Sequence, residues 1–310
     1  MRNNIHPLKG PNLMTGLMSH SNKLTLRSVI CTLFFLISLF PVPILTAGEN
    51  PTILFDKLQK MLKADGFDPE KIAPLYNRPD VRFDSRSVSL FFMHSESKLN
   101  YGQFETPKSI KQAKKYQQTH AESLTRTEKE YGVDQEVITA IILVETRLGE
   151  RLGNSLVFNT LSTMAVLENE DARQRLWRLI PADRRLSRER FEQKADKKSG
   201  WAYTELKALL RYTLAEGIDP TIIRGSYAGA MGICQFMPSN IDRLAVDGDG
   251  DGRVDLFDHE DAIASIANYL KHFGWKPGLN HKSAYKIVRR YNNSQPYAET
   301  ILTVAKLLRS

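Results

Sequence analysis

Residues 137–145 read VITAIILVE, eight residues that are apolar on nearly every face of a helix followed by a carboxylate. A helix that is apolar all round belongs in a core, so we expect a mainly α fold built around this segment. Glu145 comes near the C-terminal end of that helix. Burial and the negative helix end both disfavour a carboxylate, which predicts a raised pKa for Glu145. Such a pKa suits a general acid at neutral pH.

A simpler interpretation of Glu145 stays open. Glutamates in a last helical turn are commonly solvated, and Arg147 stands two residues later as an ion-pair partner. Spacing alone favours this structural role, because structural ion pairs also perturb the pKa of a carboxylate. The choice between the two interpretations therefore depends on the rest of the sequence.

Helical patterns continue on both sides of this central segment. The repeat of apolar residues and the positions of capping residues predict most of these helices. Asp68-Pro69 is expected to open a short one. The other expected helices cover 53–62, 109–131, 134–148, 154–167, 170–179, 201–216, 240–246, 261–273, 283–291 and 297–308.

Two segments depart from the helical pattern. Asp80–Phe104 has no 3.6-residue period, and within it Val88, Leu90 and Phe92 alternate with serines, which favours a strand or an extended segment. Ser187–Gly200 is densely charged and is expected to be a surface connection. Since no internal repeat or low-complexity linker interrupts the chain, domain boundaries are not marked by composition.

Composition excludes several classes of protein. The chain has 310 residues, 42% of them hydrophobic and 25% charged, which argues against wholesale disorder, collagen and small disulfide-rich folds. The formal net charge is +8, but residues 1–47 hold four basic side chains and no acidic one. The remainder is only mildly basic, which suits an acidic polymer or an envelope surface. We expect no nucleic-acid partner.

The N-terminus predicts export. Residues 29–45 form an apolar run with prolines near its end, preceded by Lys23 and Arg27 and followed by Thr46-Ala47-Gly48. This arrangement is typical of a signal peptide, here residues 1–47, cleaved near Ala47 and leading to the periplasm. A retained anchor in the inner or outer membrane is the alternative, although the run falls short of the roughly 20 residues of a spanning helix.

Cysteine content fits an exported protein without a disulfide. Cys31 lies at the start of the apolar run and would leave with the signal peptide, so that Cys234 is alone in the mature chain. No intrachain disulfide can then form, and the core must hold the fold. Cys234 is expected to be an inert, buried thiol.

Four blocks of sequence follow one another between residues 144 and 302. They are VETRLGERLGNSLVFNTLSTMA from 144, GSYAGAMGICQFMPSN from 225, DGDGDGRVDLFDHEDAIASIANYLKHFGW from 247 and RRYNNSQPYAETIL from 289. In this order they resemble the membrane-bound lytic murein transglycosylase B family. A looser similarity at LNYGQFETPKSI, residues 99–110, extends the resemblance over most of the mature chain.

The resemblance implies a lysozyme-like core and a peptidoglycan substrate, cut between N-acetylmuramic acid and N-acetylglucosamine. The family's catalytic acid/base corresponds to Glu145, with Gly149 completing the E-T-x-x-G block. Glu145 would protonate the glycosidic oxygen and then take the proton from the muramic C6 hydroxyl as it attacks C1. The product is a 1,6-anhydro sugar, and water is not consumed. One carboxylate suffices for such a carbon–oxygen lyase, whereas the usual glycosidase needs two.

The resemblance also implies a set of sugar-binding residues. The glycine-rich segment 225–232 lets backbone approach a ligand closely. It is neither a serine-hydrolase elbow nor a phosphate loop, and a tight helix contact is the simpler interpretation. Tyrosine combines a stacking ring with a hydroxyl, and Tyr291 is expected to lie next to Glu145. The expected substrate-binding residues are Ser226, Gln235, Tyr269, Tyr291, Asn292, Tyr297, Tyr101 and Met231, the last as apolar wall or core.

An acidic segment, DGDGDGRVDLFD at 247–258, fits a single EF-hand loop of twelve residues. Gly252 falls at position six, where the chain must turn sharply, and the short Asp258 replaces the usual glutamate at position twelve. The expected ligands are Asp247, Asp249, Asp251, the carbonyl of Arg253, Asp255 and Asp258. We expect structural Ca²⁺, or else Na⁺ or Mg²⁺, and no organic cofactor. A solvated acidic turn and a Ca²⁺ sensor are the alternatives.

The expected architecture is a lysozyme-like core, about 132–159 and 221–310, carrying a helical lobe, about 52–131 and 160–220. Together they form the catalytic region, residues 48–310, and the protein is expected to be a monomer. Many relatives carry a small β domain between the positions of Tyr269 and Tyr291, but 270–290 leaves no room for one. Two rival functions remain open: a lysozyme-type muramidase, which uses water and a second carboxylate, and a non-catalytic, Ca²⁺-stabilised wall-binding protein.

Overall fold

The computed structural model describes residues 51–93 and 100–310, with side chains from Leu54 onward. All of these residues belong to one compact unit, residues 47–310. The signal peptide expected over 1–47, with Cys31 and the apolar run 29–45, lies outside the described residues. Among the helices that are described, none has both the length and the apolar character needed to cross a bilayer.

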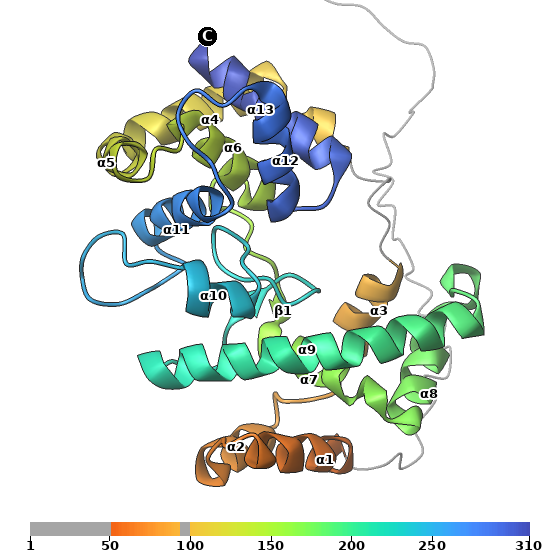
Figure 1. The fold of residues 1–310 in the computed structure, drawn as a ribbon. Helices are drawn as coiled ribbons and strands as arrows, with labels where there is room; N and C mark the ends of the chain where they lie inside the picture. Colours follow the sequence, from red (N-terminus) through yellow and green to blue (C-terminus); the bar gives the residue numbers. More distant parts are fainter. Residues whose placement is uncertain (1–50, 94–99) are drawn as a thin grey trace, which may run out of the picture. The chain divides into compact units, whose positions relative to one another are not determined.

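The fold is mainly α, as the sequence predicts (Figure 1). The helices are α1 (Pro51–Ala64), α2 (Pro69–Tyr76), α3 (Ser85–Met93), α4 (Pro107–Thr119), α5 (Ala121–Tyr131), α6 (Gln135–Thr146), α7 (Val157–Ala165), α8 (Glu170–Leu179), α9 (Arg188–Glu216), α10 (Pro238–Leu244), α11 (His259–His272), α12 (His281–Tyr291) and α13 (Gln295–Arg309). Short 3₁₀ turns cover Tyr101–Phe104, Val166–Glu168 and Ala182–Arg184. Two strands, β1 (Ser155–Leu156) and β2 (Arg224–Gly225), pair antiparallel.

The helices pack in two groups, joined by α10 (Figure 1). In one group, α7 packs along α9, with α1, α3, α8 and the 3₁₀ turn Val166–Glu168 around them. In the other, α6 packs against α13, α4, α5 and α11, and α12 packs against α13. The helices α4 and α5 therefore contact the core helices rather than α1 to α3. This packing differs from the predicted partition, which placed all of 52–131 in the helical lobe.

The strand predicted around Val88 is wrong, because these residues form helix α3. Val88 and Phe92, four residues apart, are buried on one face, whereas Leu90 is 41% exposed. Ser87 and Ser89 are buried as well. Because these buried positions are polar, the apolar residues alone show an alternating pattern and not a helical period. Apolar alternation over five residues does not distinguish a strand from a short helix whose buried face includes serines.

The charged connection predicted over 187–200 is also wrong. It forms the first part of the long helix α9, which Ser187 caps by accepting a hydrogen bond from the Arg190 amide. Phe191, Ala195 and Ser199 recur every fourth residue and are buried. The buried face formed by these residues is narrow and contains small side chains. Charged side chains on the other faces therefore obscure its helical period in the sequence.

Two predicted helix boundaries need correction. The helix expected over 109–131 is divided at His120 into α4 and α5, and the His120 ring packs against the rings of both Tyr116 and His259. The helix expected over 154–167 starts only at Val157, because Ser155–Leu156 pair with β2 instead. Residues 270–290 hold the end of α11 and most of α12, without a strand.

Candidate active site

The C-terminal end of α6 fixes the position of Glu145. Residues 137–143 of this helix are all buried, as expected for a core helix. The next residue after Glu145, Thr146, is fully buried, and its hydroxyl lies 3.1 Å from the carbonyl oxygen of Ile233. The Thr146 hydroxyl oxygen also accepts a hydrogen bond from the Gly149 amide. These contacts tie the end of α6 to the glycine-rich segment.

The chain leaves α6 through three residues with positive φ, Arg147, Leu148 and Gly149. A glycine is required at the third, where φ is +90° and a Cβ atom would lie 2.9 Å from the ring of His259. The left-handed turn directs the chain away from the helix axis directly after Glu145. The E-T-x-x-G block therefore ends a buried helix one residue after the Glu145 carboxylate.

Tyr297 is the tyrosine whose hydroxyl binds Glu145. Its O–H group donates to Oε1 of Glu145 at 2.7 Å. Burial, with a further contribution from the charge of Glu145, holds the pKa of Tyr297 well above its ordinary value, so the hydroxyl remains a donor. Tyr291, predicted to lie next to Glu145, lines the same cavity and stacks on Tyr297 with ring centroids 6.5 Å apart. Its own hydroxyl donates to the carbonyl of Cys234 at 2.5 Å.

A cavity of about 410 Å³ surrounds this tyrosine–glutamate pair. It brings together seven predicted site residues from distant parts of the chain. They are Tyr101, Glu145, Ser226, Gln235, Tyr291, Asn292 and Tyr297. Tyr101 packs edge-on against Tyr297 with ring centroids 6.3 Å apart. Among the described residues that line the cavity, Glu145 is the only carboxylate.

The glycine-rich segment forms one wall of the cavity by folding back on itself. The Ser226 amide donates to the Ala230 carbonyl at 2.8 Å, and the Ser226 hydroxyl oxygen accepts hydrogen bonds from the amides of Ala228 and Ala230. A Cβ atom on Gly225 would lie 2.1 Å from the Ala230 carbonyl oxygen, so only glycine fits there. Gln235 adopts φ +51°, and its side-chain amide donates to the carbonyl of Gly232 at 2.8 Å.

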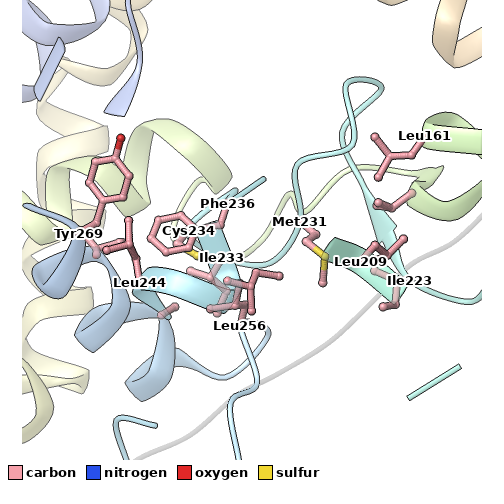
Figure 2. Close-up of a cluster of buried hydrophobic side chains, with 14 of the residues drawn as sticks. Leu161, Leu209, Ile223, Met231, Ile233, Cys234, Phe236, Leu244, Leu256 and Tyr269 are labelled. Carbon is pink, nitrogen blue, oxygen red and sulfur yellow. The ribbon is translucent and has the colours of Figure 1, made fainter. Parts of the chain in front are cut away.

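Neither Met231 nor Tyr269 lines this cavity. Met231 takes the core position that was one of its two expected roles, whereas Tyr269 was expected to bind substrate. Both belong to the hydrophobic cluster in Figure 2, where Met231 is fully buried. The hydroxyl of Tyr269 donates to the carbonyl of Arg290 at 2.6 Å, and its ring packs edge-on against Tyr291. Burial raises the pKa of Tyr269 to about 12. Tyr269 supports the cavity from behind, since its ring holds that of Tyr291.

Several lining residues were not predicted. Tyr227, Ala228 and Ala230 lie within the glycine-rich segment, but no role in substrate binding is predicted for them from the sequence. The others are Asn100, Gln103, Phe104 and Val144. Gln103 accepts a hydrogen bond from the Arg147 guanidinium, and that guanidinium lies over the ring of Phe104. The segment 99–110 could have pointed to them, because it carries the looser part of the family resemblance.

Cys234 is fully buried beneath the cavity, as expected of an inert thiol. Burial raises the pKa of Cys234 to about 12, so the thiolate is scarcely populated at neutral pH. Its carbonyl accepts the hydrogen bond from Tyr291. The residue therefore contributes packing and one backbone acceptor.

A group of carboxylates lies before and at the start of α11. Asp247, Asp249 and Asp261 each bring one carboxylate oxygen within 4.8 Å of the others. Burial raises the pKa of the Asp261 carboxyl, although the amides of Gly248 and Asp255 donate hydrogen bonds to it. Oxygen donors of this kind suit a hard cation such as Ca²⁺ or Mg²⁺. The residues present therefore fit a cation site.

The predicted set of twelve-residue-loop ligands needs correction, because the structure brings only Asp247 and Asp249 of that set into this group. Asp258, predicted at position twelve, instead caps α11 by accepting from the amide of Glu260 at 2.6 Å. Asp261, one turn further on, approaches the loop in its place. Of the remaining predicted ligands, Asp251 and Asp255 lie outside this group of carboxylates and accept from nearby backbone amides. The backbone carbonyl of Arg253 stays a predicted ligand.

Comparison with known proteins finds relatives of this chain in sequence and in fold. The chain is 30% identical over 232 residues to membrane-bound lytic murein transglycosylase B of Escherichia coli. That match covers 71% of this chain and 57% of the relative's length. The fold is similar to that of soluble lytic transglycosylase SltB1 from Pseudomonas aeruginosa, with a TM-score of 0.66 and 26% identity over 81% of this chain and 97% of the other.

A second solved structure is that of the Escherichia coli lytic transglycosylase Slt35 in complex with calcium. It has a TM-score of 0.65 and 22% identity, over 84% of this chain and 93% of that chain, so it supports the fold alone. A family model described as the transglycosylase SLT domain matches residues 53–284, which include α6, the glycine-rich segment and the acidic loop. The chain therefore belongs to the transglycosylase SLT domain family.

Proposed function

We propose that this chain is a peptidoglycan lytic transglycosylase that cleaves the β-1,4 bond between N-acetylmuramic acid and N-acetylglucosamine without water. The observation that carries the proposal is the single carboxylate, Glu145, among the described residues lining the cavity. A muramidase that activates water or forms a glycosyl ester needs a second carboxylate across the bond. A reaction whose nucleophile belongs to the substrate needs only one.

In the proposed reaction, Glu145 enters protonated and gives its proton to the glycosidic oxygen as the bond to the muramic C1 breaks. The resulting carboxylate then accepts the proton of the muramic C6 hydroxyl while that oxygen bonds to C1. Glu145 ends protonated, as it began, and the products are a free N-acetylglucosamine 4-hydroxyl and a 1,6-anhydromuramic end. Atoms and charge balance with no water molecule consumed.

Positioning within the cavity supports this sequence of steps. The hydrogen bond from Tyr297 fixes the orientation of the Glu145 carboxyl group, which must face first the leaving oxygen and then the C6 hydroxyl. Ser226 accepts two backbone hydrogen bonds, which leaves its O–H group to donate to a sugar or N-acetyl oxygen. Asn292 and Gln235 supply further polar groups in the lining. Holding a nucleophile in place can account for several kcal/mol of an activation barrier, roughly 7–11 in favourable cases.

The cation site belongs to this proposal as a structural element. Asp247, Asp249 and Asp261 would hold Ca²⁺, or else Na⁺ or Mg²⁺. Bound there, the cation would neutralise crowded carboxylates and tie the loop to the start of α11. The crystal structure of the similar Escherichia coli protein is described as a calcium complex, which is consistent with this choice of ion. The site lies outside the cavity lining, so the cation is given no part in the chemistry.

Location and partners follow from the substrate. A peptidoglycan enzyme must reach the cell envelope, and we propose the periplasm, reached through the segment 1–47 or attached to a membrane by it. The glycan strand is the expected partner, and the chain is proposed to act as a monomer. The two groups of packed helices would together form the catalytic region.

The substitution Glu145→Gln tests the assignment of the catalytic residue. The amide keeps the size of the side chain but can neither give the first proton nor take the second, so turnover should fall by about 10²–10⁴-fold or more. Mass spectrometry of digested peptidoglycan should show anhydro-muropeptides for the unaltered protein and none for the variant. Glu150→Gln, at an exposed glutamate outside the cavity lining, is the matched control and should retain activity.

The alternatives give different results in the same experiment. Reducing muropeptides as the main product would identify a muramidase, and no soluble product would favour a wall-binding protein. Full activity in folded Glu145→Gln protein would overturn the role given to Glu145.

A further inference from the structure

The connection between α8 and α9 carries a dense group of arginines. Residues 173–190, from within α8 to the start of α9, contain seven arginines and only two acidic residues, Asp183 and Glu189. None of these residues lines the catalytic cavity. Figure 1 shows α8 beside the first turns of α9, whereas Asp242 of α10 pairs with Arg211 in the second half of α9. This group, here called the arginine patch, therefore lies away from the catalytic residues.

Most arginines of the patch have no carboxylate partner. Two of them, Arg173 and Arg188, share Glu192. Over the described part of the chain, no ion pair with a carboxylate is formed by the other five, which are Arg175, Arg178, Arg184, Arg185 and Arg190. The patch thus presents positive charge that folding leaves available to a partner of opposite charge.

Exposed apolar side chains accompany this charge. Leu179, the last residue of α8, is 50% exposed, and Pro181 and Ala182 just after it are exposed as well. Arg178 and Arg184, both exposed, flank this short segment. A single exposed leucine is ordinary, but apolar side chains among unpaired arginines match a surface that rests on lipid, where cations meet headgroups and apolar groups enter the acyl boundary.

The connection after α8 is held in a defined shape. The Arg185 guanidinium donates to the carbonyl of Ile180 at 2.6 Å and to that of Arg178 at 3.1 Å, which satisfies the end of α8. The guanidinium groups of Arg185 and Arg188 each lie 5.2 Å from the centre of the Trp177 ring. The exposed side chains of the patch therefore extend from a fixed support.

The patch belongs to the same helix group as α1, the first helix after the apolar run 29–45. Helix α1 contacts the turn Val166–Glu168, where Lys57 pairs with Glu168 at 2.8 Å, and that turn also contacts α8. An apolar run kept in a bilayer would hold α1 within a few residues of the lipid surface. The position of the patch in the chain thus favours a membrane over a soluble acidic partner.

We propose that the arginine patch docks the protein on a lipid bilayer that carries anionic phosphate headgroups. Guanidinium groups bind phosphate oxygens in pairs, and a negatively charged membrane surface attracts each basic side chain close to it. Leu179 would enter the boundary between headgroups and acyl chains. The contact goes beyond the proposed activity, because it leaves the catalytic cavity uncovered and would keep the protein beside a membrane while it acts on the wall.

Vesicle binding tests the proposal. The chain from Gly48 is used, because residues 47–310 form one compact unit and the apolar run must not carry the binding. It should co-sediment with vesicles of phosphatidylglycerol and phosphatidylethanolamine, less so at high salt, and not with phosphatidylcholine alone. Arg178→Gln with Arg184→Gln should weaken binding by about 25-fold, as for two cations removed at an anionic surface. Leu179→Ser should weaken it by about 3- to 10-fold, since half of that side chain is left to be buried in lipid.

The matched control is Arg243→Gln with Arg290→Gln, which removes the same charge from exposed positions on α10 and α12. It should leave vesicle binding unchanged. Thermal unfolding verifies that every chain is folded, and all variants should keep the digestion activity of the unaltered chain, because none of these residues lines the catalytic cavity.

Three results would overturn the proposal. The first is an absence of binding to the anionic vesicles. The second is an equal loss of binding in the two arginine pairs, which would show that only net charge matters. The third is an unchanged affinity of Leu179→Ser for vesicles together with equally strong binding to soluble polyglutamate or displacement by inorganic phosphate, which would identify an acidic protein or free phosphate as the partner.

Discussion

Tyr297→Phe removes the hydrogen bond that the Tyr297 hydroxyl donates to Oε1 of Glu145. The substitution removes a hydroxyl whose oxygen lies 2.7 Å from that atom and keeps the ring, which is 1% exposed and stacks on Tyr291. Packing should therefore change little. Orientation of the carboxyl group should be lost in both halves of the reaction.

The expected magnitude follows from the charge on the acceptor. A hydrogen bond to a charged group contributes about 1.5–3 kcal/mol. If that contribution is made mainly in the transition state, kcat should fall by about 10- to 150-fold. KM should change little, because the lost contact is with the protein's own acid and not with the sugar. Initial rates of anhydro-muropeptide release, measured against peptidoglycan concentration, give both constants.

Tyr269→Phe is the matched control from the same aromatic cluster. Its hydroxyl donates to the Arg290 carbonyl, outside the cavity lining, so the substitution should lower thermal stability and leave kcat per folded molecule unchanged. The reasoning would be refuted if Tyr297→Phe kept full kcat, or if it lost no more activity than Tyr269→Phe.

Two further predictions concern the surroundings of the site. Cys234, fully buried with its pKa raised to about 12, should not react with an aromatic disulfide reagent at pH 8 until denaturant unfolds the chain; fast reaction of the native protein would contradict the burial. Calcium at about a hundredfold excess over its Kd should stabilise the fold by about 2.7 kcal/mol, measured as a shift in thermal unfolding against chelator. Asp261→Asn should abolish that shift, while Asp258→Ala, which removes a helix cap, should lower stability with and without calcium; the reverse pattern would restore the twelve-residue EF-hand interpretation.

The helical fold was predictable from sequence wherever a buried face was wide and apolar. The segment 137–145 is the clearest case, because its helix is buried on every side and needs no amphipathic stripe to be recognised. Helix α3 and the first half of α9 were missed for the opposite reason. Their buried faces include serines and alanines, so the hydrophobic period is weak where small residues allow close packing.

The candidate site was predictable in composition but not in its detailed contacts. Family resemblance supplied Glu145 and half of the lining residues, whereas spacing alone favoured a solvated glutamate. No sequence pattern decides which of Tyr291 and Tyr297 reaches Glu145, since that depends on how α12 and α13 pack against α6. The acidic loop shows the same limit, because Asp261 reaches it from the next helix, and loop spacing cannot reveal that.

Digestion of peptidoglycan in ¹⁸O-labelled water tests the central claim most directly. The claim is that the nucleophile at the muramic C1 is the substrate's own C6 hydroxyl, consistent with a cavity whose described lining has Glu145 as its only carboxylate. Mass spectrometry of the released fragments should then show muramic ends that are 18 mass units lighter than reducing ends and carry no label. Reducing muramic ends labelled at C1 as the main product would contradict the account, even if Glu145 proved essential.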